Sequence, residues 1–147
     1  MARADFRYKS ELRVRFGETD LQGVVYNAEF LAYFDAAQAD YFRHLGVPLG
    51  DMRERGHDVV IVDISVQFLA PAHFDEMIEV FTRISDIGDS SMKMDYEVYE
   101  KESGRSVAAS RVAYVIVNPE TGRPVHAPAY LRAAVRNFEE NTEIEAE

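Results

Sequence analysis

Apolar residues recur along the chain with two different periods, and these periods predict one long helix among strands. Residues 12–16 alternate strictly between apolar and polar side chains, which predicts a first strand. From Asn27 to Leu45 the apolar side chains recur every three or four residues, as on one face of a helix. Asn27 is a suitable N-cap, and Gly46 followed by Pro48 predicts the end of this helix. The helical stripe consists of Phe30, Phe34, Ala37, Tyr41 and Leu45.

Four later segments show the period of two that is typical of β-strands, with short turns between several of them. Short turns at residues 88–90 and 103–104 indicate hairpins and therefore an antiparallel sheet. One long helix with about five antiparallel strands predicts an α+β fold in which the sheet wraps around the central helix. The expected strands are 60–70, 78–84, 92–98 and the more apolar 107–117, and a short last helix is expected at 128–138.

The length of 147 residues is typical of a single domain, and no internal repeat or linker divides the chain. We therefore expect one domain over residues 1–140. Residues 141–147 carry three Glu, no basic residue and one large apolar side chain, Ile144. Because one apolar anchor does not offset the entropy of ordering a segment, we expect residues 141–147 to form a disordered acidic tail.

Composition excludes several classes of function. The chain has no cysteine, which excludes disulfides, a cysteine nucleophile and thiolate metal sites. Four scattered histidines show no spacing typical of metal ligands, so we expect neither a metal nor another cofactor. The net charge of −10 argues against a nucleic-acid partner. No apolar run reaches the ~18–20 residues of a membrane span, and no signal segment is visible at the start, so we expect a cytoplasmic protein without a membrane partner.

Common catalytic motifs are also missing, and one segment remains as a candidate site. There is no G-x-S-x-G elbow and no glycine-rich phosphate loop, and the sequence GDSS at residues 88–91 lies in a predicted hairpin turn. The remaining segment is GETDLQGVVYNAEF, in which Asp20 precedes Asn27 by seven residues. A carboxylate beside the free N–H groups of a helix N-terminus can act on an ester-like carbonyl. The same residues also form an ordinary acidic turn with a helix cap, and the residues alone leave both interpretations open.

The segment ETDLQGVVYNAEFLAYFDAAQADYFRHLG resembles the signature of the hot-dog-fold acyl-CoA thioesterases, specifically the 4-hydroxybenzoyl-CoA thioesterase family. The shared pattern is an acidic pair around Thr19, then D-x-x-G-V-V, an aromatic residue and the start of a helix. PAHFDE at residues 71–76 is similar to a second, weaker block of that family. The resemblance implies a five-stranded sheet around a central helix. It also implies a homodimer, or a homotetramer, with sheets paired edge to edge and active sites at the dimer interface.

The resemblance further implies roles for individual residues. Asp20 matches the catalytic carboxylate, which acts as a nucleophile or as a general base for water, and Asn27 matches the residue whose backbone N–H polarises the carbonyl. Gly23 allows close approach of the backbone, and Val25 and Tyr26 would line the acyl pocket. The implied substrate is an acyl-CoA or acyl-carrier thioester, hydrolysed without metal or cofactor. Residues 87–91 lack the basic residues with which some relatives hold the CoA phosphates, so those contacts are expected elsewhere.

Three alternatives to a hydrolase are considered. A non-catalytic module that binds acyl thioesters would share the fold, but the complete motif around Asp20 favours the enzyme. A hot-dog dehydratase usually needs a histidine beside an acidic residue, and no histidine lies between Met1 and Phe42. A purely structural domain that binds a protein partner is the third alternative.

Overall fold

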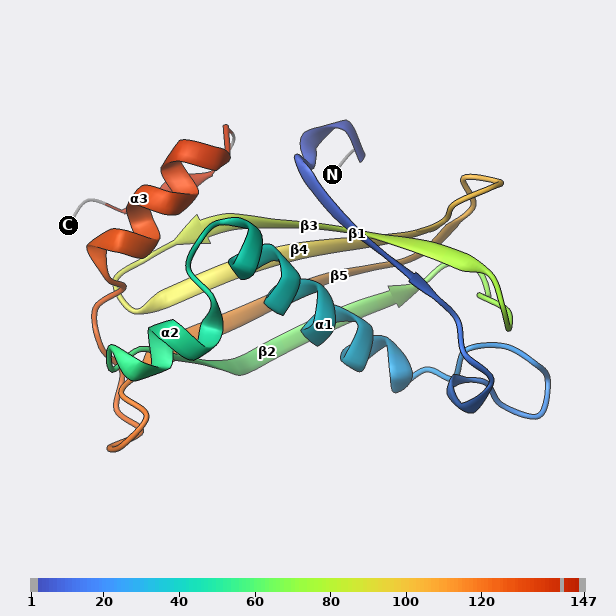
Figure 1. Cartoon of the computed structure of the whole chain (residues 1–147), viewed down its shortest axis with the longest axis horizontal. Helices are drawn as coiled ribbons and strands as arrows, with labels where there is room; N and C mark the ends of the chain where they lie inside the picture. The colour runs from blue at the N-terminus through green and yellow to red at the C-terminus, as the bar shows by residue number, and fades with distance from the viewer. Residues whose placement is uncertain (1–2, 141, 146–147) are drawn as a thin grey trace.

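A computed structural model describes residues 3–140 and 142–145 of the chain (Figure 1). Within this part of the chain, α1 lies along one face of a sheet, α2 follows it, and α3 lies at one end (Figure 1). In chain order, the elements are the 3-10 helix η1 (Arg3–Asp5), β1 (Tyr8–Arg13), the 3-10 helix η2 (Phe16–Glu18), α1 (Glu29–His44), α2 (Leu49–Glu54), β2 (Asp58–Phe68), β3 (Met77–Ile87), β4 (Ser91–Glu100), β5 (Ser106–Val117), α3 (Ala129–Phe138) and β6 (Glu143–Ile144).

The sheet has the strand order β1-β3-β4-β5-β2, and each neighbouring pair is antiparallel. The apolar stripe of α1 packs on one face of this sheet, where the rings of Phe34 and Tyr96 are 5.0 Å apart. Both side chains are buried, as are Tyr41 on α1 and Tyr114 on β5. The predicted α+β fold, with a sheet around a central helix, is therefore confirmed.

The start of α1 differs from the prediction that Asn27 is its N-cap. The helix begins at Glu29, and its N-cap is Ala28, which has a helical backbone and no side-chain cap. The N–H of Glu29 donates to the carbonyl of Tyr26 at 2.9 Å, so a tight turn precedes the first helical residue. This turn places Asn27 one residue too early to cap the helix. Helix α2 was not predicted, because six residues are too few to show a helical period.

Strand β2 forms one edge of the sheet, and none of its 11 residues is buried. A bulge between Ile61 and Asp63 shifts its alternation by one residue. Ile61 and Ile64 therefore lie on the side of α1, whereas Val62 is 60% exposed. The period of two expected over residues 60–70 is therefore interrupted here, because counting periods in a sequence does not detect a bulge.

The acidic tail is partly docked on the sheet. Strand β6 runs parallel to the end of β3, where the Glu145 N–H donates to the carbonyl of Ile87 at 2.8 Å. The Thr142 hydroxyl donates to the carbonyl of Ile84 at 2.6 Å. Strand β1 pairs with β3 only as far as Thr82, so the backbone beyond it is available to β6. Residues 142–145 thus differ from the disordered tail expected over 141–147, of which 141, 146 and 147 lie outside the described residues.

Candidate active site

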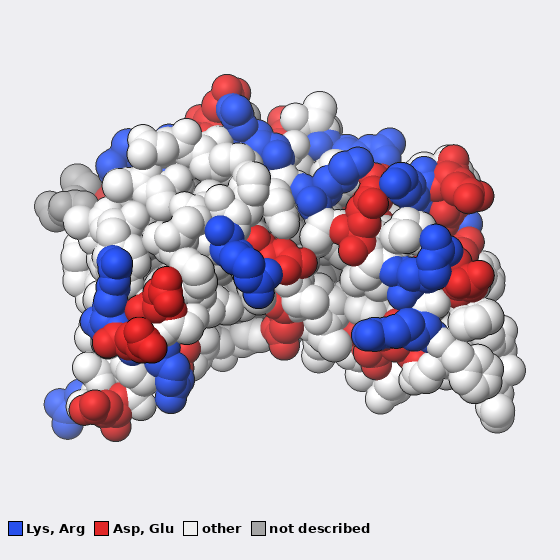
Figure 2. All heavy atoms as spheres, viewed as in Figure 1, with Lys and Arg blue, Asp and Glu red and all other residues white. Residues whose placement is uncertain are grey.

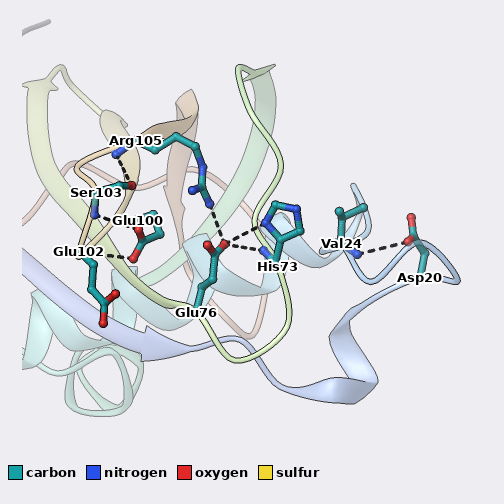
Figure 3. A network of polar contacts seen from close by, with 8 residues as sticks. All are labelled: Asp20, Val24, His73, Glu76, Glu100, Glu102, Ser103 and Arg105. Carbon is teal, nitrogen blue, oxygen red and sulfur yellow. Dashed lines mark hydrogen bonds and ion pairs between the residues drawn. The ribbon is translucent and has the colours of Figure 1, made fainter.

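Asp20 lies in a small hairpin between η2 and α1. Its N–H donates to the carbonyl of Val24 at 2.9 Å, and Gly23, at φ +77°, closes the turn by donating to the carbonyl of Asp20 at 3.0 Å. The Asp20 carboxylate accepts the N–H of Gln22 at 2.8 Å through Oδ1. The same oxygen accepts the N–H of Val24 at 3.4 Å (Figure 3). The side chain is exposed, and Oδ2 has no partner within the described residues. One carboxylate oxygen is therefore held in place while the other is available.

This hairpin is held against the segment that leads into β3. Val24 forms a β-bridge with His73, and the N–H of Val25 donates to the carbonyl of Ala72 at 2.8 Å. The N–H of Phe74 donates to the carbonyl of Gly23 at 3.2 Å. The two family-like blocks, around Asp20 and at residues 71–76, therefore meet in space.

His73 is fixed beside this bridge by a short polar network (Figure 3). Its backbone N–H donates to Glu76 Oε1 at 2.7 Å, and its Nδ1 lies 3.3 Å from the same oxygen. Arg105, from the β4–β5 hairpin, donates to this oxygen at 2.7 Å. No role in the site was predicted for His73, although the family-like block at residues 71–76 indicated that this segment contributes.

Glu18 is a buried carboxylate that sequence reasoning did not single out. It is 6% exposed and accepts hydrogen bonds from the Arg15 N–H at 2.9 Å, from Arg15 Nε at 2.8 Å and from the Tyr33 hydroxyl at 2.9 Å. Burial raises the pKa of Glu18, but these hydrogen bonds together outweigh burial and hold its pKa below the usual range. Its carbonyl also accepts the N–H of Tyr26 at 3.2 Å. Glu18 thus ties the Asp20 hairpin to both η2 and α1.

The turn before α1 presents two unused backbone donors. Within the described residues, the N–H groups of Asn27 and Ala28 donate to no protein acceptor, whereas that of Glu29 is satisfied. Asn27 borders a pocket of about 320 Å³ between this turn and the end of β2. Such N–H groups suit an oxygen that gains negative charge. The pocket is lined by Val24, Val25, Asn27, Phe30, Phe68, Leu69, Ala70, Pro71 and Ala72.

A second cavity of about 230 Å³ lies further along the seam between α1 and β2. The rings of Phe30 and Phe68, which both line the first pocket, pack edge to face, 5.7 Å apart. The residues that line the second cavity are mostly apolar. Asp35 is the one carboxylic acid among them, and burial raises its pKa. An apolar seam beside backbone donors is suited to an acyl group. The second cavity is lined by Leu31, Phe34, Asp35, Ile61, Ile64, Val112 and Tyr114.

The structure brings together most of the residues named from the sequence. Val25 and Asn27 line the first pocket, and Asp20 lies in the hairpin whose Val24 lines the same pocket. Gly23 shapes that hairpin rather than a pocket wall. Tyr26 is 53% exposed and is absent from both linings, in contrast to the expected role in an acyl pocket.

Among residues 3–140 and 142–145, no three His, Asp or Glu side chains are grouped as metal ligands would be. The helices in this part of the chain include none with the length and apolar character needed to cross a membrane.

Comparisons with known proteins place the chain in a family. A family model described as the thioesterase-like superfamily matches residues 14–135. The chain is 26% identical over 121 residues to the acyl-CoA thioester hydrolase YbgC of Escherichia coli, covering 82% of this chain and 90% of that protein. It is 24% identical over 135 residues to the acyl-CoA thioesterase YbgC of Haemophilus influenzae, covering 91% and 98%.

Solved structures show the same fold. A protein of Aquifex aeolicus matches with a TM-score of 0.81 and 25% identity, covering 87% of this chain and 98% of that chain. A 1,4-dihydroxy-2-naphthoyl-CoA thioesterase from Synechocystis matches with a TM-score of 0.82 and 23% identity, covering 89% and 96%. The long family match and the shared architecture agree with the motif around Asp20. The chain belongs to the thioesterase-like superfamily and has its hot-dog fold.

Proposed function

We propose that this chain hydrolyses an acyl-CoA thioester to a free acid and CoA, with Asp20 as the catalytic carboxylate. The observation that carries the proposal is that the hairpin of Asp20, whose Oδ2 is uncommitted, contributes Val24 to the wall of the first pocket, where the N–H of Asn27 is also uncommitted. The names of the YbgC relatives support an acyl-CoA substrate over other thioesters.

The proposed chemistry uses backbone donors and one carboxylate. The thioester carbonyl oxygen accepts the N–H groups of Asn27 and Ala28, which stabilise the negative charge that develops on it. Asp20 either attacks the carbonyl carbon or takes a proton from the water that attacks it. If Asp20 attacks, the C–S bond breaks as a mixed anhydride forms, and water then cleaves the anhydride to release the acid and regenerate Asp20. If water attacks directly, the C–S bond breaks in the same addition–elimination step. The net reaction in both routes adds the elements of water, with the hydroxyl on the acid and the remaining proton on the departing sulfur. The apolar seam between α1 and β2 holds the acyl group.

The active unit we propose is a homodimer formed through β2. This edge strand exposes backbone groups and three consecutive apolar side chains, Val60, Ile61 and Val62, which are 39%, 48% and 60% exposed. A long apolar edge strand that stays unpaired invites association. A two-fold axis pairs the same edge of two copies, so the two β2 strands run antiparallel. Pairing would also cover the seam that holds the acyl group.

One assay with two readouts tests this proposal. The purified chain is incubated with short, long and aromatic acyl-CoA thioesters and with an acyl-carrier-protein thioester, and released thiol is measured, while light scattering gives its mass. We expect turnover of at least one acyl-CoA by a particle of two or more chains. Tight binding of a thioester without release of thiol would favour the non-catalytic module, and a monomer at micromolar concentration would contradict the dimer.

A further inference from the structure

Every basic residue described in contact with the segments around Asp20 is already paired with a carboxylate. Arg15 Nη2 lies 2.6 Å from Glu18, and Arg105 Nη2 lies 2.7 Å from Glu76. Arg13 donates to the carbonyl of Asp75 at 2.7 Å, and the same nitrogen lies 3.8 Å from its carboxylate. Figure 2 shows the same mixing of basic and acidic side chains over much of the helical face. This end of the molecule therefore offers a bound phosphate little uncompensated positive charge.

The opposite end of the sheet carries two arginines without such partners. Arg55 follows α2, and Arg123 precedes Pro124, which bridges to Val117 at the end of β5. Val117 in turn pairs with Asp58 at the start of β2, so both arginines flank the same strand end. Within residues 3–140 and 142–145, neither arginine forms an ion pair with a carboxylate.

Arg55 is also held in a defined position. Its guanidinium carbon lies 4.6 Å from the ring centre of Tyr130, on α3. The Tyr130 hydroxyl lies 2.8 Å from Nδ1 of His57, which fixes this ring against the segment that leads into β2. Burial and the charge of Arg55 lower the pKa of His57, so Arg55 is the cation of this cluster at neutral pH. A guanidinium stacked on an aromatic ring retains its N–H groups for two-point contact with phosphate.

The length of β2 separates this cluster from the Asp20 site of the same chain. Its 11 residues span about 33 Å at about 3.3 Å per residue. Arg55 and α2 lie beside its first residue, whereas the first pocket includes its last residue, Phe68. Figure 1 shows α2 and the hairpin before α1 at opposite ends of the sheet. In a dimer with antiparallel β2 edges, the first residue of one β2 lies near the last residue of the other. The arginines of one subunit therefore lie near the Asp20 site of the partner subunit.

From this geometry we propose that Arg55 and Arg123 of one subunit bind the phosphate groups of the CoA whose thioester is held at Asp20 of the partner subunit. The inference rests on the proposed function and on its β2-paired dimer. It gives each active site two parts: one chain supplies the carboxylate and the backbone donors, and the other supplies the phosphate contacts. The tyrosine ring beside Arg55 also offers a flat surface at the nucleotide end of CoA.

Calorimetric titration tests the phosphate contacts without requiring turnover. Free CoA and pantetheine, which lacks the phosphates, are each titrated into wild-type protein, Arg55→Gln and Arg123→Gln. We expect each variant to bind CoA about tenfold or more weakly, since a hydrogen-bonded charge pair is lost, and to bind pantetheine as the wild type does. Lys93→Gln is the matched control, because Lys93 is exposed between two buried residues of β4 and so points away from α1. Unchanged CoA affinity, or equal weakening for both ligands, would overturn the assignment.

Hybrid dimers test whether Arg55 acts across the interface. One chain carries Asp20→Asn and the other carries Arg55→Gln, and the mixed dimer is isolated with two different affinity tags. If Arg55 serves the partner's site, one site of the hybrid is intact, and its KM for acyl-CoA equals that of the wild type. If Arg55 serves its own chain, the one site with Asp20 lacks Arg55, and the raised KM persists, which would contradict the proposal. If no thioester of the panel is hydrolysed, the proposed hydrolase activity is refuted. The phosphate contacts are still tested, because calorimetry measures CoA binding without turnover.

Discussion

The Tyr33 hydroxyl donates a 2.9 Å hydrogen bond to Glu18 Oε1, and this contact joins the second turn of α1 to the segment that leads into Asp20. Both side chains are buried, and the remaining acceptor capacity of Glu18 is used by Arg15. The loop that carries the candidate carboxylate is therefore fixed by a charged hydrogen bond to the same helix whose N-terminus offers the N–H donors.

Replacing Tyr33 with Phe tests this attachment. The substitution removes one hydrogen bond to a buried carboxylate, so we expect the free energy of unfolding to fall by about 1.5–3 kcal/mol. Denaturant unfolding measures the change. Tyr26→Phe is the control, because Tyr26 is 53% exposed, and a change within about 0.5 kcal/mol is expected there. Equal effects in the two variants would mean that the Glu18 contact contributes nothing to stability.

The environment of Glu18 implies that the free energy of unfolding depends on pH in the acidic range. The hydrogen bonds to this carboxylate hold its pKa in the folded protein below the ordinary value of 4.5, in spite of burial. The stabilisation it provides is therefore complete above about pH 5 and is lost as the pH falls through the lower folded-state pKa. We therefore expect the stability difference between wild type and Glu18→Gln to be constant above about pH 5 and to shrink as the pH falls below it. A difference that stays constant on acidification, or that grows, would contradict this assignment.

Two substitutions at Asn27 separate its side chain from its backbone N–H. Asn27 does not cap α1, so Asn27→Ala keeps the proposed oxyanion donor and is expected to retain most activity and stability. Asn27→Pro removes the N–H, and loss of one such donor typically costs about 10²–10³ in kcat. Circular dichroism first establishes that the proline variant is folded. Equal activity in both variants, or loss of activity in the alanine variant alone, would exclude this N–H as the donor.

The docked tail predicts a cost for truncation. Removing residues 141–147 deletes the β6 pairing and leaves Nη1 of the fully buried Arg132 without the Glu145 carbonyl. We expect the free energy of unfolding to fall by about 1–3 kcal/mol, while kcat is unchanged because β6 pairs with β3, which β4 and β5 separate from the β2 edge. Deletion of residues 146–147 alone leaves the described contacts in place and is the control. An unchanged melting temperature after the longer deletion would restore the expectation of a dispensable tail.

The periodic part of the fold was predictable because each prediction depended on many side chains. The apolar positions that predicted α1, β3, β4 and β5 recur over seven or more residues in each element, so tertiary contacts do not override them. Features decided by single contacts were missed. The bulge at Ile61 is a local shift of register, the start of α1 at Glu29 follows a turn closed by one hydrogen bond to Tyr26, and the docking of Thr142 depends on a hydrogen bond to Ile84 on β3.

The residues of the candidate site were likewise predicted where a local sequence pattern marks them and missed where it does not. Asp20, Gly23 and Asn27 were found because a recognisable block places them in one local turn. Glu18 and His73 act through contacts that no local pattern encodes. Glu18 contacts Tyr33, 15 positions further along the chain, and His73 bridges to Val24, 49 positions before it. The exposed Tyr26 shows the converse, because its place in the block did not determine the direction of its side chain.

The most direct test of the account is the kcat of Asp20→Asn on the best acyl-CoA of the panel. The asparagine Oδ1 can still accept the N–H groups of Gln22 and Val24, so the hairpin and the melting temperature are expected to be preserved. Loss of the nucleophile or general base is expected to lower kcat by at least about 10²–10⁴. Glu29→Gln, which removes a carboxylate from the first turn of α1, is the control and should retain most activity. A folded Asp20→Asn variant with near-wild-type kcat would contradict the central claim.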